Sequence, residues 1–240
     1  MKPDYQTPDG SVTLYRGDCT KVLAKLKKGA ATVTLTDPPW AIGLKYDGYD
    51  DTKDNLQKLI DRFMPECRRI CKKVLVMSGV SNVTMYPHPD WICAVAWNTT
   101  FSYGKYGFSQ WTPVICYGND TKKRSSGGII QADVIRMDGT GFSRSADEKK
   151  HPCPKPSSMM RMVMARLTLE SDVVLDPFLG SGSTAVAAIE AGRKFVGIEQ
   201  SPKYFKVAVK RIEDALKQPR LFTGEQVLWS KRSPRPRLRL

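Results

Sequence analysis

The sequence predicts an α/β fold whose core is a mostly parallel, doubly wound sheet. Two observations predict this class: short β-branched runs alternate with longer amphipathic segments, and no internal repeat breaks that alternation. The chain has 240 residues, enough for one large domain with a full apolar core. We therefore expect a single folded domain over residues 11–217.

Seven segments have the length and apolar character of strands. The run at residues 31–36 is β-branched and leads directly into Asp37-Pro38-Pro39-Trp40. An acid, two prolines and an aromatic residue make an unusual end to a strand. The other expected strands cover residues 11–16, 73–78, 91–97, 113–117, 172–176 and 194–198.

Five segments carry apolar residues at helical spacing. Residues 21–26 follow Thr20, which can cap a short helix. Residues 55–71 form an amphipathic helix pattern that Pro65 is expected to kink or split. The remaining expected helices cover residues 157–167, 185–191 and 202–217.

Three segments lack a regular pattern. Residues 43–49 form a Gly/Tyr/Asp loop that we expect to be mobile. Residues 118–150 are polar and basic, and so long a loop in a compact domain is usually functional or disordered. Residues 218–240 form a basic, proline-rich tail that we expect to be disordered.

Charge and cysteine content narrow the class of protein. The net charge is +14, which favours a polyanionic partner such as nucleic acid over the alternative of charge serving solubility. No apolar run approaches a membrane span and no signal core begins the chain, so we expect no membrane partner and a cytoplasmic location. The 6 cysteines form no CxxC pair and the chain has 2 histidines, so we expect reduced thiols and no metal site.

The Asp37-Pro38-Pro39-Trp40 segment offers hydrogen-bond acceptors beside a flat aromatic face. Ligands of open α/β sheets bind at the carboxyl ends of the strands, where this segment lies. The Asp37 carboxylate and free backbone carbonyls can accept hydrogen bonds, and Trp40 can stack on a planar ring. The combination suits a ring that carries an amino group. The alternative is a Pro-Pro turn with a solvated acid and a core tryptophan.

A second segment predicts a nucleoside cofactor. Gly180 and Gly182 allow a tight turn between a strand and a helix, whose amino terminus favours a negative group. Glu199 ends the next strand, where an acid can bind ribose hydroxyls. Asp18 ends the first strand in the same manner and could accept from an adenine amino group, or simply flank the following helix. The loose dinucleotide fingerprint also leaves an NAD-dependent oxidoreductase as an alternative.

Five segments in order carry a family resemblance. They are Leu14-Tyr15-Arg16-Gly17-Asp18-Cys19, Asp37-Pro38-Pro39-Trp40, His151-Pro152-Cys153-Pro154-Lys155-Pro156, Asp176-Pro177-Phe178-Leu179-Gly180-Ser181-Gly182-Ser183-Thr184 and Gly197-Ile198-Glu199-Gln200-Ser201-Pro202-Lys203-Tyr204. In this order they resemble the motifs of the β class of S-adenosylmethionine-dependent DNA amino-methyltransferases, which modify adenine N6 or cytosine N4. The resemblance covers most of residues 11–215.

The resemblance implies a circularly permuted Rossmann-like methyltransferase fold with one antiparallel strand. It implies that Asp37, Pro38, Pro39 and Trp40 are catalytic, and that Asp176 lies near the ammonium of the cofactor, Glu199 on its ribose and Asp18 on its adenine. The full set of implied residues for binding S-adenosylmethionine is Asp18, Cys19, His151, Lys155, Asp176, Pro177, Phe178, Gly180, Gly182, Ser183, Thr184 and Glu199.

The implied partner is double-stranded DNA, and the implied target is a base extruded from the duplex, with adenine N6 favoured. Residues 118–150 stand in the place of a short target-recognition insertion. Its candidate DNA contacts are Lys122, Lys123, Arg124, Arg136 and Arg144. A restriction-modification role fits the family. Alternatives are cytosine N4 methylation, the same chemistry on RNA, and a nucleic-acid-binding protein that has lost catalysis. The resemblance leaves open a homodimer, and a bacterial or a phage origin.

Overall fold

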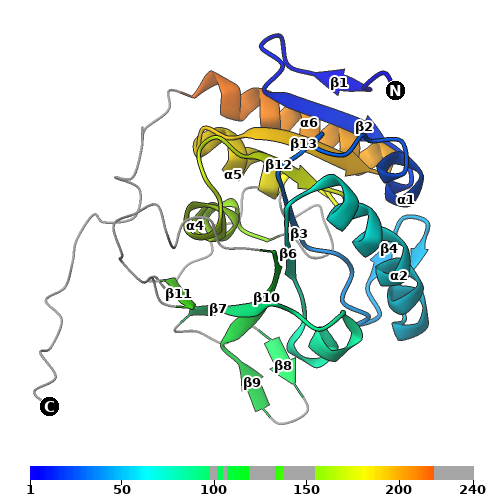
Figure 1. The fold of residues 1–240 in the computed structure, drawn as a ribbon, viewed down its shortest axis with the longest axis vertical. Coiled ribbons are helices and arrows are strands. Elements are labelled where there is room, and N and C mark those ends of the chain that lie inside the picture. The colour runs from blue at the N-terminus through cyan, green and yellow to red at the C-terminus, as the bar shows by residue number, and fades with distance from the viewer. Residues whose placement is uncertain (98–101, 105–106, 119–132, 138–154, 219–240) are drawn as a thin grey trace, which may run out of the picture.

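In a computed structural model of the chain, the strand that leads into Asp37 lies in the middle of a nine-stranded sheet (Figure 1). The structure describes residues 1–97, 102–104, 107–118, 133–137 and 155–218. Across the sheet the strands follow the order β1 (Tyr5–Gln6), β2 (Val12–Arg16), β13 (Lys194–Glu199), β12 (Val173–Asp176), β3 (Val33–Thr36), β6 (Lys73–Met77), β10 (Trp111–Tyr117), β7 (Trp91–Trp97) and β11 (Val134–Met137).

Most neighbouring strands are parallel, as the sequence predicts. The pairs β2–β13, β13–β12, β12–β3, β3–β6 and β7–β11 are parallel, whereas β10 is antiparallel to both of its neighbours. The short edge strand β1 is also antiparallel to β2. The expectation of one antiparallel strand therefore holds for β10 and misses β1, whose two residues carry too little pattern to predict a strand.

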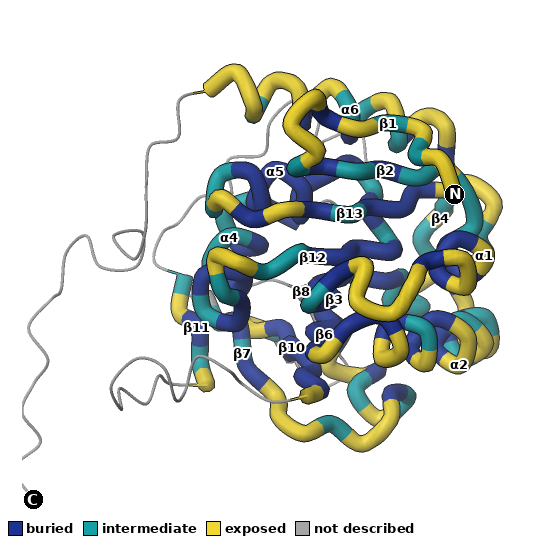
Figure 2. The backbone as a smooth tube through the Cα atoms, turned by 45° about the horizontal axis from the view of Figure 1, so that its top comes forward, coloured by how far each residue is buried: buried dark blue, intermediate teal, exposed yellow. Residues whose placement is uncertain are grey.

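Helices cover both faces of the sheet and bury two apolar clusters. Helices α4 (Ser157–Leu167), α5 (Ser183–Glu190) and α6 (Pro202–Lys217) contribute to one cluster, and α1 (Cys19–Leu23) and α2 (Lys53–Ile70) contribute to the other. Figure 2 shows the central strands as largely buried, while exposed residues follow the outer surface of α2 and α6. This double covering is the physical reason why the central strands read as nearly continuous apolar runs.

The order of the strands confirms a permuted arrangement. Strand β2, near the start of the chain, pairs in parallel with β13, and Val12 lies opposite Phe195. The backbone amide of Gly17 donates to the carbonyl of Glu199 at 2.9 Å. The chain thus places Asp18 beside Glu199 although the two residues are far apart in sequence.

Two helices differ from their expected form. Helix α1 begins at Cys19, and its cap is Asp18 rather than Thr20, because the Asp18 carboxylate accepts from the backbone amide of Thr20 at 2.9 Å. Helix α2 is continuous through Pro65. Pro65 and Asp61 are both exposed, so water can bond the Asp61 carbonyl that Pro65 leaves without an amide donor.

Three segments contain strands that were not expected. The loop at residues 43–49 forms a hairpin of β4 (Lys45–Tyr46) and β5 (Tyr49–Asp50). A second hairpin, β8 (Ser102–Gly104) and β9 (Gly107–Ser109), lies between β7 and β10 in sequence. The basic stretch at residues 118–150 contains β11, which extends the edge of the sheet beyond β7.

None of the described helices has both the length and the apolar character needed to cross a membrane. Within the same part of the chain, no group of three or more His, Cys, Asp or Glu side chains is placed to hold a metal ion.

Candidate active site

The carboxyl ends of β2, β13, β12 and β3 meet at one edge of the sheet and open onto a single cavity. The volume of this cavity is about 420 Å³. Parallel pairing brings the strand ends together, so residues from four distant segments share its wall. The lining includes these predicted site residues: Asp18, Cys19, Asp37, Pro39, Pro177, Phe178, Gly180 and Glu199.

The glycine turn between β12 and α5 depends on left-handed backbone. Gly180 has a φ of 55° and Gly182 has a φ of 87°, values that a side chain disfavours. A Cβ atom on Gly182 would also come within 3.1 Å of the Ala208 Cβ in α6. Gly180 lines the cavity, whereas Ser183 and Thr184 begin α5 and are 7% and 4% exposed. Neither hydroxyl residue lines the cavity: Arg211 donates to the Ser183 hydroxyl at 3.3 Å, and the Thr184 hydroxyl bonds Asp176.

Glu199 connects the end of β13 to the glycine turn. Its Oε2 accepts from the amide of Gly180 at 2.8 Å, and its Oε1 accepts from the amide of Ser201 at 2.7 Å. Burial raises the pKa of Glu199 to about 7, and the backbone hydrogen bonds oppose that rise. Because each carboxylate oxygen has a second lone pair, Glu199 can still accept from hydroxyl groups in the cavity.

Asp18 both caps α1 and faces the cavity. Its Oδ1 accepts from the amide and the hydroxyl of Thr20, at 2.9 Å and 2.8 Å. The helix-flanking role is thus present, and the carboxylate also lines the cavity. The neighbouring Cys19 is 8% exposed, and burial raises the pKa of its thiol to about 12, so this thiol stays protonated at neutral pH.

Asp176 is buried at the end of β12 and is not among the residues that line the cavity. It is 1% exposed and accepts from the Thr36 hydroxyl at 2.6 Å and from the Phe178 amide at 3.0 Å. Thr184 also donates a side-chain hydrogen bond to it, and burial raises its pKa to about 6. The observed contacts of Asp176 therefore join β3, β12 and α5 at the carboxyl edge of the sheet.

The β4–β5 hairpin forms a wall of the cavity that sequence reasoning missed. Its lining residues are Tyr46, Asp47, Gly48, Tyr49 and Asp50. The Ser201 hydroxyl donates to Asp47 Oδ2 at 2.9 Å, and the Gln200 side chain donates to the Asp47 carbonyl at 3.2 Å, so the hairpin is tied to the start of α6. The Asp47-Gly48 dipeptide between two tyrosines was a usable hairpin signal.

Asp51 fixes the start of this hairpin. It is 4% exposed, and its carboxylate accepts from the backbone amides of Ala41, Ile42 and Leu44 at 2.8–3.0 Å. Ala41 has a φ of 53°, a left-handed conformation that is rare for a residue with a side chain. The loop after Trp40 is therefore held by hydrogen bonds to an internal acid, and residues 43–49, expected as a loop, take part in the β4–β5 hairpin.

One face of α2 supplies another part of the lining that was not predicted. The contributing residues are Asn55, Lys58, Leu59 and Arg62. The Arg62 guanidinium donates to the Thr20 hydroxyl at 2.9 Å, next to Asp18. The helical spacing of residues 55, 58, 59 and 62 places them on one face, which was the available signal.

Asp37 lies where this cavity meets a second group of side chains. Its side chain is 18% exposed, and its two carboxylate oxygens have different partners. The Lys155 ammonium donates to Oδ2 at 2.7 Å, and the Trp40 indole N–H donates to Oδ1 at 3.0 Å. Burial raises the pKa of Asp37, and the positive charge of Lys155 and both hydrogen bonds oppose that rise.

Trp40 is half-buried beside Asp37 and is contacted on several sides. The Lys155 Nζ lies 4.0 Å from its ring centroid, and the Asn82 side-chain amide donates to its carbonyl. A Cβ on Gly79 would lie 3.4 Å from Trp40 Cε3, so the backbone approaches the ring closely there. Lys155 was grouped with the cofactor residues from the sequence, but the structure places it on Asp37 and Trp40 and outside the described cavity lining.

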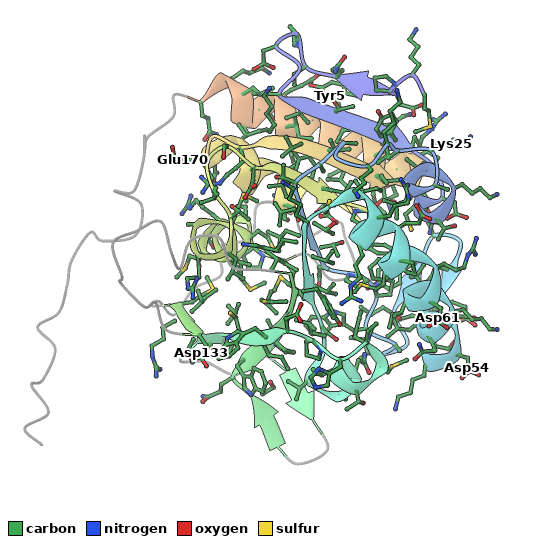
Figure 3. All side chains as sticks on the ribbon, in the orientation of Figure 1. Tyr5, Lys25, Asp54, Asp61, Asp133 and Glu170 are labelled. Carbon is green, nitrogen blue, oxygen red and sulfur yellow. The ribbon has the colours of Figure 1, made fainter. Side chains whose placement is uncertain are left out.

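Most of the predicted DNA-contact residues lie outside the described part of the chain. These are Lys122, Lys123, Arg124 and Arg144, together with His151 of the predicted cofactor set and the tail at residues 219–240. Arg136 is described and is exposed on β11. Figure 3 shows the neighbouring Asp133 at the same outer edge of the sheet.

Comparison with known proteins points to one family. A family model described as "DNA methylase" matches residues 108–210. The DNA adenine methyltransferase YhdJ of Escherichia coli (strain K12) is 25% identical over 248 residues, which cover 85% of this chain and 83% of that protein.

Solved structures agree on the fold. The M1.HpyAVI–SAM complex matches with a TM-score of 0.61 and 19% identity over 84% of this chain and 98% of that chain. The PvuII DNA methyltransferase, described as cytosine-N4-specific, matches with a TM-score of 0.65 and 16% identity over 90% of this chain and 93% of that chain.

Proposed function

Because the chain belongs to the family of amino-group DNA methyltransferases, we propose that it transfers a methyl group from S-adenosylmethionine to the exocyclic amine of a base in DNA. The observation that carries the proposal is that Asp37 shares one cavity with Gly180 and Glu199. The acid of the D-P-P-W segment and the glycine turn thus lie close enough for two bound reactants to meet. Adenine N6 is the favoured target, since the relatives include a DNA adenine methyltransferase.

The cavity suits a cationic nucleoside of the size of S-adenosylmethionine. Its lining carries the acids Asp18, Asp37 and Glu199, and a carboxylate-rich wall favours a sulfonium over an anionic ligand. Glu199 would accept from the ribose hydroxyls, Asp18 from the adenine amine, and Gly180 would allow the ligand to approach the backbone. Nicotinamide cofactors fit this wall poorly because their pyrophosphate is negatively charged.

The residues of this chain would orient the exocyclic amine of the base, which is a weak nucleophile. The lone pair of an exocyclic amine is delocalised into its ring. The Asp37 carboxylate and the Pro38 carbonyl would accept the two N–H bonds and Trp40 would stack on the base, which directs the lone pair out of the ring plane. Positive charge grows on the nitrogen as the new bond forms, so the carboxylate stabilises the transition state more than the ground state. S-adenosylmethionine, when bound, would supply an electrophilic methyl group and leave as the neutral thioether once the S–CH₃ bond breaks, and the methylated nitrogen would then lose one proton.

DNA binding is supported by the charge of the chain. The net charge of +14 favours a polyanion, and phosphate contacts would make the affinity fall steeply with salt. The candidate contacts at residues 122–124, 136 and 144 remain proposals, as does a homodimer.

A methyl-transfer assay tests the proposal directly. The full chain is incubated with methyl-labelled S-adenosylmethionine and either double-stranded DNA or RNA of the same sequence. We expect label in the DNA, as N6-methyladenine after digestion. Label in RNA alone would support the RNA alternative, N4-methylcytosine would change the target base, and no transfer to either polymer would refute the proposed activity. Single-molecule sequencing of DNA from expressing cells would then identify the recognition site.

A further inference from the structure

We propose that Lys155 is a positioning residue of the methyl-transfer site, which orients the Asp37 carboxylate and covers the ring of Trp40 until a target base displaces it. The inference deepens the proposed function and rests on it. It assigns Lys155 to the target base rather than to the cofactor.

The contact between Lys155 and Asp37 is short and shielded from water. The Lys155 Nζ lies 2.7 Å from Asp37 Oδ2, and the two side chains are 5% and 18% exposed. Lys155 stands between Pro154 and Pro156, and a residue that precedes proline is restricted to extended backbone. Pro156 in turn caps α4, so the backbone of Lys155 is anchored to a buried helix. The ion pair is thus shielded and its lysine backbone is anchored, unlike in a surface ion pair.

The ion pair matters because burial disfavours the charge of the Asp37 carboxylate. Burial favours the neutral acid, and the buried Asp176 carboxyl on β12 lies near enough to interact with Asp37 electrostatically. Tyr86 follows the 3₁₀-helix η1 (Val80–Met85), and the charge of Asp37 adds to the effect of burial in raising the pKa of its phenol. Of the described groups that act on the Asp37 carboxyl, the cation is Lys155. Removing one partner of such a pair leaves an uncompensated buried charge.

Lys155 also occupies the aromatic surface that a target base would need. Its Nζ lies over the Trp40 ring at 4.0 Å from the centroid, within the range of a cation–π contact. The Trp40 indole N–H meanwhile donates to Asp37 Oδ1. A base that stacks on Trp40 and donates its amine to Asp37 must therefore displace these contacts. The long, flexible lysine stem allows the ammonium to leave the ring while it remains near the carboxylate.

The proposed role and a cofactor role predict different kinetics. If Lys155 supports Asp37, its loss lowers kcat and moves the acid limb of the pH profile, because activity requires an ionised Asp37. If Lys155 instead holds the cofactor, its loss weakens the binding of S-adenosylmethionine. The described lining of the cavity does not include Lys155, which favours the first outcome.

The experiment compares Lys155→Met and Lys155→Arg with Lys25→Met in the full chain. Lys25 is exposed, follows the end of α1 (Figure 3) and is not among the residues that line the cavity. For Lys155→Met we expect kcat to fall about 100-fold near neutral pH, as for loss of a group that supports transition-state charge. The acid limb of the pH profile of kcat for this variant should shift to higher pH by about one unit or more. Its dissociation constant for S-adenosylmethionine, from calorimetry, should stay within about threefold. Lys155→Arg should recover most of kcat, and Lys25→Met should match the parent.

Two results would overturn the inference. One is a Lys155→Met enzyme that keeps its kcat and its acid limb. The other is a loss of S-adenosylmethionine affinity that accounts for the whole loss of kcat/KM.

A stability measurement covers the case in which Lys155→Met folds poorly. Urea unfolding is measured for the parent, Lys155→Met, Asp37→Asn and the double variant. We expect Lys155→Met to destabilise the chain and Asp37→Asn to restore much of that loss in the double variant, because no unpaired charge is then buried. Strictly additive effects would refute the pairing. This cycle needs no substrate, so it stays informative even if the parent transfers no methyl group to DNA, the result that would refute the proposed function.

Discussion

The carboxylate of Glu199 accepts a hydrogen bond from the backbone amide of Gly180, with 2.8 Å between Oε2 and the amide nitrogen. This bond joins the end of β13 to the turn after β12 and fixes the glycine turn against the acid of the neighbouring strand. Its strength depends on the protonation state of Glu199, and so does the ability of Glu199 to accept from a ribose.

We predict that the affinity for S-adenosylmethionine rises with pH through about 7, where Glu199 ionises. The ionised carboxylate accepts hydroxyl hydrogen bonds better than the neutral acid does. Calorimetric titrations from about pH 6 to about pH 8 should show this rise in the parent and in Glu170→Gln, an exposed control (Figure 3). Glu199→Gln should bind more weakly at the upper end and show a flat profile. An unchanged slope in Glu199→Gln would contradict the assignment.

The same group makes a signed contribution to the stability of the free chain. The pKa of Glu199 in the folded chain lies above the ordinary value of 4.5, so its contribution to stability is fully present below that value. The contribution is lost as pH rises through about 7. The free energy of unfolding in urea of the parent, measured relative to that of Glu199→Gln, should therefore fall as the pH rises from 4.5 to about 7. A difference that is independent of pH would contradict this prediction.

Replacing Asp37 by asparagine should abolish most methyl transfer. An amide oxygen can still accept one N–H, but it carries no charge to stabilise the positive nitrogen of the transition state. We expect kcat to fall by about 10²–10³-fold, a larger loss than that of S-adenosylmethionine affinity, to which Asp18 and Glu199 still contribute. Asp61→Asn on the exposed face of α2 is the matched control. Full activity in Asp37→Asn would exclude a direct catalytic role for the carboxylate.

Gly182→Ala should destabilise the chain more than Gly29→Ala does. Both glycines have left-handed backbone, with φ values of 87° and 83°. A Cβ on Gly182 would also press against Ala208, whereas one on Gly29 meets nothing within 4 Å. We expect a loss of about 2–4 kcal/mol for Gly182→Ala and about 1 kcal/mol for Gly29→Ala. Equal losses in urea unfolding would show that the contact between α5 and α6 is not tight at this point.

Releasing the β4–β5 hairpin should speed the loss of the cofactor. In Asp47→Ala the carboxylate that accepts from the Ser201 hydroxyl is absent. One such bond contributes about 1 kcal/mol, which corresponds to about a fivefold faster dissociation of S-adenosylmethionine. Stopped-flow displacement measures the rate, with the exposed Asp54→Ala on α2 as control. An unchanged rate in Asp47→Ala would mean that the hairpin does not limit release.

Local pattern accounts for the strands and helices that build the core. Strand β3 and helix α2 were predictable because burial imposes apolar periodicity on them. Strand β11 was missed because Val134–Met137 is a short edge strand within a basic stretch and pairs with β7 alone among the described strands. The β4–β5 hairpin was missed because the Asp47-Gly48 turn signal was interpreted as part of a loop. The hydrogen bonds of the buried Asp51 that fix the start of the hairpin leave no periodic signal.

The same distinction applies to the site: residues at the ends of predicted strands could be identified from the sequence, and contacts between distant positions could not. Asp18, Asp37 and Glu199 were identifiable because each follows a predicted strand, and parallel strands present such residues at one edge. The bond between Lys155 and Asp37 was not identifiable, since it joins positions that no local pattern relates. The family resemblance instead grouped Lys155 with the cofactor residues.

The pairing of β2 with β13 also constrains how the protein is made. While the chain emerges from the ribosome, β2 can find its neighbour β1, but its parallel partner does not exist until residues 194–199 have been synthesised. The half of the sheet that holds Asp18 and Glu199 thus closes almost last, after β3 and β6 can already have paired. A nascent chain halted before β13 would expose the apolar side chains of Val12 and Leu14, which are fully buried in the folded protein.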